Sequence, residues 1–140
     1  MASKRRPIAQ PRMGATAETR RRPICFLSAG MLDASHYLSE ASVPLVNLNA
    51  EADALPHAWS SCVLERFGGG NFKVLRMDGT PYPDEVHNYA EGLLVIDGEL
   101  RLRIDGDAVT VSRGELYVVP AGVPHSVDPG SAGTLVILDV

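Results

Sequence analysis

Downstream of residue 60, short apolar runs alternate with turn dipeptides along the chain. Residues 72–77 and 99–104 alternate apolar with charged side chains, which predicts strands that bury one face. Residues 93–96 are apolar throughout, as expected of a strand that is covered on both faces. Further strands are expected at residues 62–67, 109–111, 116–119 and 134–138, with turns at 68–71, Asp97-Gly98 and Asp105-Gly106. About eight short strands in roughly 80 residues predict an all-β fold, a small antiparallel β-barrel.

The residues upstream of 60 carry fewer strand signals. Residues 31–42 and 49–53 each predict a short helical turn. His36 and His57 lie in this part of the chain, and His57 stands close to Trp59, the one tryptophan of the sequence. A histidine beside a large aromatic side chain, just ahead of a strand, is typical of packing. We therefore expect neither histidine to bind a ligand.

The formal charge is divided unevenly along the chain. Residues 1–22 carry +6 and the remaining residues −10, which together give the net charge of −4. An acidic domain without a basic groove does not suit nucleic-acid binding, so we expect no nucleic-acid partner. The basic, proline-bearing start predicts a largely disordered N-terminal arm at residues 1–42, followed by a single domain at residues 43–140.

No stretch of the chain approaches the ~20 consecutive apolar residues that a membrane-spanning helix requires. Arg20-Arg21-Arg22 precede the apolar run Ile24–Leu27, which is too short for an export signal. Cys25 and Cys62 form no Cys-x-x-Cys pair, so a zinc site built on thiolates is not expected. We therefore predict a cytoplasmic protein with no membrane partner.

Two strand-rich blocks place carboxylates and histidines at loop positions beside apolar strands. The first block reads Gly79, five residues, Glu85-Val86-His87, three residues, Glu91, six residues, Gly98. The second block reads Gly114, five residues, Pro120-Ala121-Gly122, two residues, His125. Residues two apart in an extended strand point to the same side, so Glu85 and His87 should face one way. A barrel would let Glu91 and His125 converge although 34 positions separate them in the sequence.

Over roughly residues 62 to 139, this arrangement resembles the two-block signature of the cupin superfamily. The second block matches through His125, with Pro129 where the signature has asparagine. The first block matches in spacing but has Glu85 where the signature has its first histidine. The resemblance implies a small single-domain cupin of the conserved-barrel type, with a jelly-roll-like β-barrel. It also implies a homodimer, because small cupins commonly pair through uncovered edge strands.

By the same resemblance, four side chains at matching positions bind one divalent metal ion: Glu85, His87, Glu91 and His125. Mixed nitrogen and oxygen ligands suit iron(II), manganese, nickel, cobalt or zinc. The expected function is that of a small metal-binding cupin that acts on a small organic molecule, as a dioxygenase, isomerase or lyase. No residue pattern specifies the catalytic residues or the substrate.

Two alternatives stay open. The signature tolerates a loop that is one residue longer in the first block, and that register would place Asp84 and Val86 at the two histidine positions. It would leave Asp84, Glu91 and His125 at the site, which is a poor metal centre. The second alternative is a metal-free cupin that binds a sugar-like or other small ligand without catalysis. Three tyrosines are candidates for the mouth of the barrel or, equally, for packed strand positions: Tyr82, Tyr89 and Tyr117.

Overall fold

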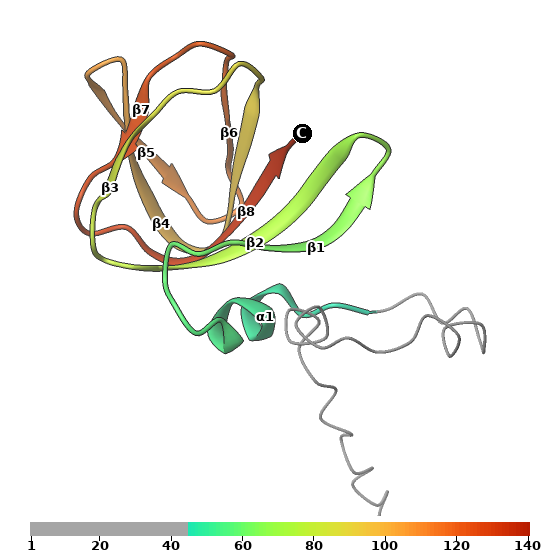
Figure 1. The fold of residues 1–140 in the computed structure, drawn as a ribbon. Helices are drawn as coiled ribbons and strands as arrows, with labels where there is room; N and C mark the ends of the chain where they lie inside the picture. Colours follow the sequence, from blue (N-terminus) through green and yellow to red (C-terminus); the bar gives the residue numbers. More distant parts are fainter. Residues whose placement is uncertain (1–44) are drawn as a thin grey trace, which may run out of the picture.

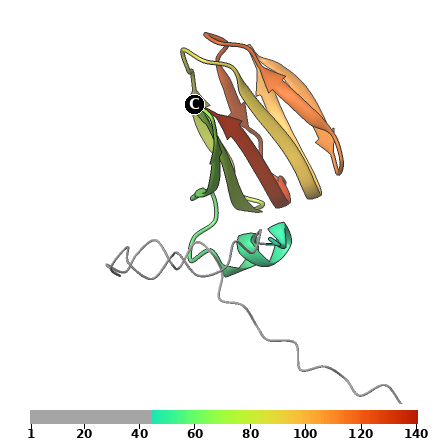
Figure 2. The same cartoon turned by 90° about the vertical axis from the view of Figure 1, so that its right-hand side faces the viewer.

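The structure is a computed structural model that describes residues 45–140. These residues form one short helix and eight strands, in chain order α1 (Leu48–Ala54), β1 (Cys62–Phe67), β2 (Gly70–Asp78), β3 (Tyr82–Glu85), β4 (Glu91–Ile104), β5 (Asp107–Ser112), β6 (Leu116–Val119), β7 (His125–Val127) and β8 (Ala132–Asp139). The strands form one antiparallel sheet that curls on itself, and α1 lies outside it, next to β2 (Figure 1, Figure 2). The predicted all-β antiparallel fold is therefore confirmed, with the sheet curled into an open barrel.

Several expectations concern the beginning of the chain. The proposed arm at residues 1–42, the helical turn at residues 31–42 and His36 all lie outside the described residues. The division into an arm and a single domain therefore stays a prediction. Within residues 45–140, no helix has the length and the apolar character needed to cross a membrane.

Strand β4 connects both halves of the curled sheet. The strand order is β1-β2-β8-β4-β7-β3, and β5 and β6 also pair with β4. The first half of β4 pairs with β6 and β8, and its second half, from Glu99 on, pairs with β5 and, at residues 102–104, also with β7. The sequence predicted two strands joined by a hairpin turn at Asp97-Gly98. That prediction is wrong, because β4 runs through both residues without reversing.

Two glycines explain why the chain bends at this point rather than reverses. Gly98 (φ 79°) lies opposite Gly133 (φ 113°) in the β4–β8 ladder, whose register shifts between Val95 and Asp97. A Cβ atom on Gly98 would lie 1.9 Å from the carbonyl oxygen of Ala132, and one on Gly133 would lie 2.1 Å from that of Asp97. The glycines therefore let the two backbones approach closely where β4 changes partners.

Helix α1 begins one residue before the helical turn predicted at residues 49–53. The Asn47 side chain caps it, since its Oδ1 accepts from the backbone N–H three residues later at 3.1 Å. The helix covers part of the outer face of the sheet, where Ala52 clusters with Val74. Because of this cover, β2 is buried on both faces, and the prediction of one buried face for residues 72–77 is wrong.

Inside the barrel, apolar side chains give way to charged ones toward one end. The buried core includes Leu75, Val95, Leu100, Leu102 and Leu135. Full burial of each such side chain contributes about 1.5–3 kcal/mol. Lys73 on β2, Glu91 on β4 and Asp139 on β8 each stand two positions from an inward-facing apolar residue, and so share its face. The interior therefore has an apolar end and a charged end.

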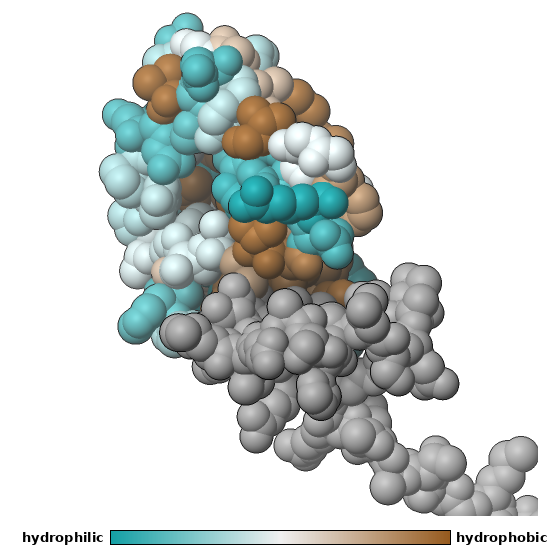
Figure 3. All heavy atoms as spheres, turned by 45° about the vertical axis from the view of Figure 1, so that its right-hand side comes forward, coloured by the Kyte–Doolittle hydropathy of each residue, from teal (hydrophilic) through white to brown (hydrophobic). Residues whose placement is uncertain are grey.

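Outside the barrel, α1 leaves part of the sheet uncovered. Four exposed apolar side chains lie there: Phe67, Leu116, Val118 and Leu138. Leu138 and Val118 both pair with Gly92, over which the Leu116 and Leu138 side chains meet. Phe67 joins them through Phe72, whose ring it contacts edge-on and which pairs with Leu138. We call these four residues the outer apolar patch; exposed apolar side chains appear in brown on the face shown in Figure 3.

Candidate metal centre

The fold brings the four predicted ligand residues to the charged end of the interior. Glu85 ends β3 and pairs with His125, the first residue of β7, so their side chains share one face of the sheet. Glu91 is the first residue of β4, and His87 lies in the loop between β3 and β4. The backbone N–H of Gly122 donates to the carbonyl oxygen of His87 at 2.7 Å. This bond ties the loop of the first block to the turn of the second.

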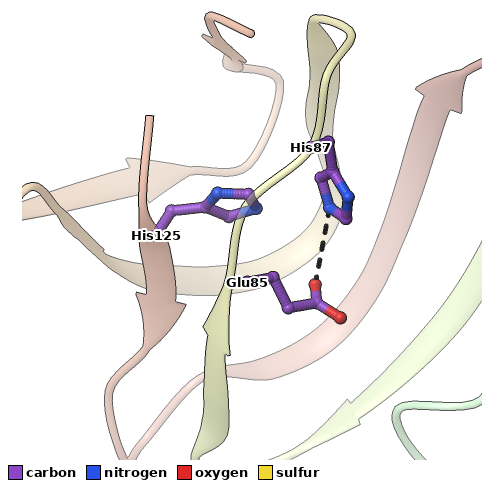
Figure 4. A group of neighbouring side chains, drawn as sticks. All are labelled: Glu85, His87 and His125. Carbon is purple, nitrogen blue, oxygen red and sulfur yellow. Dashed lines mark ion pairs between the residues drawn. The ribbon is translucent and has the colours of Figure 1, made fainter. Parts of the chain in front are cut away.

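Polar atoms of these residues lie at separations typical of ligands that share one ion. His87 Nε2 is 3.7 Å from Glu85 Oε2 and 3.9 Å from Glu91 Oε2. His125 Nε2 is 3.2 Å from Glu91 Oε2. One ligand atom each from Glu85, His87 and His125 lies within 4.8 Å of the others, and Figure 4 shows these side chains pointing toward a common space. Since metal–ligand bonds measure ~2.0–2.3 Å, two ligand atoms on one ion lie about 3–4.5 Å apart.

The two imidazole Nε2 atoms differ in their surroundings: that of His125 faces a carboxylate, and that of His87 has no hydrogen-bond partner among the described residues. His125 is 5% exposed, and its Nδ1 lies 3.2 Å from the carbonyl oxygen of Val123, to which an Nδ1–H donates. In that tautomer the lone pair of Nε2 faces the Glu91 carboxylate, which is itself an acceptor. His87 Nε2 is buried and has no hydrogen-bond partner among the described residues. A divalent transition metal ion fits this donor set, because it would satisfy both lone pairs and both carboxylates together.

The first block adopts the shorter loop register. Asp84 and Val86 are both exposed, and Val86 keeps 60% of its accessible surface. Glu85 and His87 instead line the cavity of the barrel, with 38% and 22% of their side chains exposed. The arrangement with Asp84 and Val86 at the histidine positions is therefore not the one that the chain adopts.

A cavity of about 180 Å³ opens beside these residues. Three aromatic side chains line it: Trp59, Tyr82 and Tyr89. The Tyr89 ring stacks on the His87 imidazole with ring centroids 5.0 Å apart and an interplanar angle of 6°, which holds the plane of the imidazole. Tyr117, which was a further candidate for the mouth, packs against the apolar core instead.

Two further charged residues line the cavity, and the sequence pattern did not predict them there. Lys73 and Asp139 both line it, on β2 and β8. Lys73 belongs to the alternating run at residues 72–77, where charged side chains were expected to face solvent. Its position two residues before the apolar core residue Leu75 was the signal that could have placed it inside.

The charges of the centre act on Tyr82. The negative charge of Glu85 is the largest of several causes that raise the pKa of Tyr82; burial, a hydrogen bond with Glu85 and the charge of Glu91 follow. Trp59 packs against the Tyr82 ring, with centroids 5.6 Å apart. The indole N–H of Trp59 donates to Asp78 Oδ1 and Thr80 Oγ1, both at 2.9 Å. The Tyr82 hydroxyl thus stays protonated and can donate toward the carboxylates.

Known proteins resemble this chain in sequence over part of its length. The family model described as "Cupin domain" matches residues 75–140. A 65-residue stretch is 37% identical to quercetin 2,3-dioxygenase of Bacillus subtilis (strain 168). This match covers 44% of the chain and 19% of the dioxygenase, so the chain corresponds to less than a fifth of that relative.

Solved structures share the curled sheet. A cupin-2 domain containing protein from Shewanella frigidimarina NCIMB 400 has a TM-score of 0.62 at 24% identity, over 68% of this chain and 93% of that one. A cupin superfamily protein from Desulfitobacterium hafniense DCB-2 has a TM-score of 0.60 at 15% identity, over 71% and 92% of the two chains. Residues 75–140 match the cupin domain and the structure has the barrel of solved cupins, so this part of the chain is a cupin domain.

Proposed function

We propose that the protein holds one divalent transition metal ion between Glu85, His87, Glu91 and His125, and acts on a small organic molecule as a dioxygenase. The observation that carries the proposal is the buried His87 Nε2, which has no hydrogen-bond partner within residues 45–140. Two nitrogen and two oxygen ligands suit iron, manganese, nickel, cobalt or zinc. The likeness to a quercetin dioxygenase over 65 residues favours oxygen chemistry over isomerase or lyase chemistry.

The residues around the centre have separate roles in this proposal. A bound ion would supply a Lewis-acid centre with positions open to substrate. Val123 and Tyr89 hold the imidazoles of His125 and His87 in place, which keeps their Nε2 atoms aimed at one point. The two carboxylates balance the charge of a divalent ion. The aromatic and aliphatic walls of the cavity exclude water and orient a flat ligand.

Metal analysis of protein produced without a histidine tag tests this proposal. We expect about one transition metal ion per chain, the number that one four-ligand site holds. Dioxygen uptake with oxygen-bearing aromatic compounds should stop after chelation and return when the metal is restored. Protein that stays metal-free after incubation with each of the five candidate metals would contradict the proposal.

A metal-free ligand-binding cupin is the second candidate, and one contact favours it. His125 Nε2 and Glu91 Oε2 are 3.2 Å apart, which is a direct hydrogen bond in the tautomer whose Nε2–H donates to the carboxylate. In that case the His125 resonances in NMR spectra would not respond to added metal, while aromatic ligands would still raise the melting temperature. A response of His125 to sub-stoichiometric metal would reject this candidate.

We further propose that the protein is a homodimer and that it works in the cytoplasm. The outer apolar patch supports the dimer, because four exposed apolar side chains on one sheet face form a surface that association would cover. The cytoplasmic location stays a prediction from the sequence.

A further inference from the structure

An ion pair inside the cavity has no part in the proposed metal centre. Lys73 Nζ pairs with Asp139 Oδ2, and Asn71 Nδ2 donates to Asp139 Oδ1 at 2.9 Å. The side chain of Asp139 is 3% exposed and that of Lys73 is 23% exposed. Both residues line the same cavity as the four candidate metal ligands.

The two polar groups lie on different walls of the barrel. In the sheet order, β2 and β8 lie on one side of β4, while β7 and β3 lie on the other. Lys73 and Asp139 come from the first pair of strands, and His125 and Glu85 come from the second. A ligand in the cavity could therefore contact Lys73 with one end and the candidate metal centre with the other.

A purely structural role accounts poorly for this ion pair. Backbone pairing already joins β2 to β8 along their length, from Asn71–Asp139 to Asp78–Ala132. Burying two charges carries a desolvation cost that an apolar pair of similar volume avoids. The ammonium group has three donors. Among residues 45–140 its hydrogen bond goes to Asp139, so the geometry leaves donors for a ligand.

We propose that Lys73, held in place by Asp139, is the cation that binds the substrate or ligand in this cavity. The ligand class is a single-ring aromatic molecule with an acceptor oxygen, either a carboxylate or a phenolic oxygen, on Lys73. The cavity volume of about 180 Å³ and the aromatic walls suit one substituted ring. Reaction of that molecule at the metal rests on the proposed function, whereas its binding to Lys73 does not.

The test compares three probes of similar size: benzoate, phenol and toluene. Their affinities are measured by NMR titration for the parent and for Lys73→Met, Lys73→Arg and the control Arg113→Met, which removes an exposed positive charge outside the cavity. We expect Lys73→Met to lower the affinity for benzoate or phenol about 10- to 100-fold, which is the effect of losing a hydrogen bond from a charged donor. The affinity for toluene should change less than about threefold. Lys73→Arg should keep part of the affinity for the oxygen-bearing probes, and Arg113→Met should bind all three probes as the parent does.

A second variant covers the case in which Lys73→Met unfolds because it leaves a buried carboxylate unpaired. Lys73→Met/Asp139→Asn removes both charges and keeps an acceptor for Asn71, so it should fold and show the same selective loss. A merely structural ion pair would change the affinity for all three probes alike, and that result would overturn the inference. A parent protein that binds neither benzoate nor phenol would overturn the inference as well.

Metal content is measured on every variant, so that the two proposals fail separately. Metal-free parent protein with Lys73-dependent benzoate or phenol binding would reject the dioxygenase and leave the inference standing. If the parent protein holds metal but binds benzoate and phenol as tightly after Lys73→Met as before, the role of Lys73 is rejected and the dioxygenase proposal stands.

Discussion

The two imidazoles of the proposed centre are held in different ways. His87 comes from a loop and is oriented by the Tyr89 ring, whereas His125 starts β7 and is fixed by a hydrogen bond to the Val123 carbonyl oxygen. Three of the four candidate ligands belong to the first block and can move together. His125 is the one nitrogen donor that the second block contributes. Its loss should therefore be the hardest to compensate.

For this reason, we predict that His125→Ala lowers metal content more than Glu85→Ala does. Removing a ligand should weaken metal binding by more than the ~10–100-fold that loss of an outer-shell partner costs. Glu85 is the more exposed residue, and water can take its coordination position. Metal content and circular dichroism of both variants, measured beside the parent, check the prediction. Equal metal occupancy in folded samples of all three proteins would reject it.

The pKa of Tyr82 reports on the charge of the centre. Glu85→Gln should lower this pKa toward its ordinary value, since the charge of Glu85 is the largest cause of its rise. Bound metal should act in the same direction, because it offsets the carboxylate charge. An ultraviolet absorbance titration measures the change, and Tyr82→Phe identifies the signal among the chain's four tyrosines. The same pKa in Glu85→Gln and in the parent would contradict the assigned cause.

The raised pKa of Tyr82 also sets the sign of its effect on stability. The folded state holds the phenolic proton more tightly than the unfolded state does, so the neutral hydroxyl stabilises the fold. This contribution is complete below the unfolded-state pKa of ~10 and is lost as the pH rises through the folded-state value. Tyr82→Phe should therefore have a flatter unfolding free energy above pH ~10 than the parent.

The bend of β4 depends on close backbone contact with β8. We predict that Gly98→Ala destabilises the protein far more than Gly106→Ala does. Both glycines have positive φ, so each alanine adds roughly 1–2 kcal/mol of backbone strain. A Cβ at Gly98 would also lie 1.9 Å from the Ala132 carbonyl oxygen, whereas one at Gly106 meets nothing within 4 Å.

Urea unfolding of the two glycine variants and the parent measures this difference. Gly106→Ala should lose about 1–2 kcal/mol of unfolding free energy. Gly98→Ala should lose several times more, or fail to give folded protein, because β4 and β8 would have to separate. Similar losses in the two variants would mean that the close contact between these strands is not what requires glycine.

For the molecule as a whole, the outer apolar patch predicts self-association. Val118 lies on this patch and is 54% exposed, so Val118→Lys should leave the fold intact and favour the monomer. Val86→Lys is the matched control, since Val86 is 60% exposed and lies outside the patch. Size-exclusion chromatography with light scattering gives the mass of each protein. A monomeric parent, or a dimer that persists in Val118→Lys, would contradict the prediction.

Local patterns in the sequence were sufficient for most strands and for the residue types of the site. Alternation, apolar runs and turn glycines are properties of neighbouring residues, so β1, β2, β5, β6 and β8 could be predicted with small errors at their ends. The exceptions are β3 and β7, which were not predicted as strands, and β4, which was predicted as two. The spacing of the two blocks identified Glu85, His87, Glu91 and His125 as candidates before any geometry was known. It left the loop register open, because exposed Asp84 and inward Glu85 differ by a single residue.

Contacts between distant residues decided the rest. Asp97-Gly98 continues a strand rather than turning because Gly133, far along the chain, leaves room for a close crossing. Residues 72–77 are covered on both faces because α1 packs on the outside of the sheet. Lys73 lies inside because the curl of the sheet turns its face inward, toward Asp139. Alternation shows that the two faces of a strand differ, but only the closed sheet determines which face lies inside and which charges meet there.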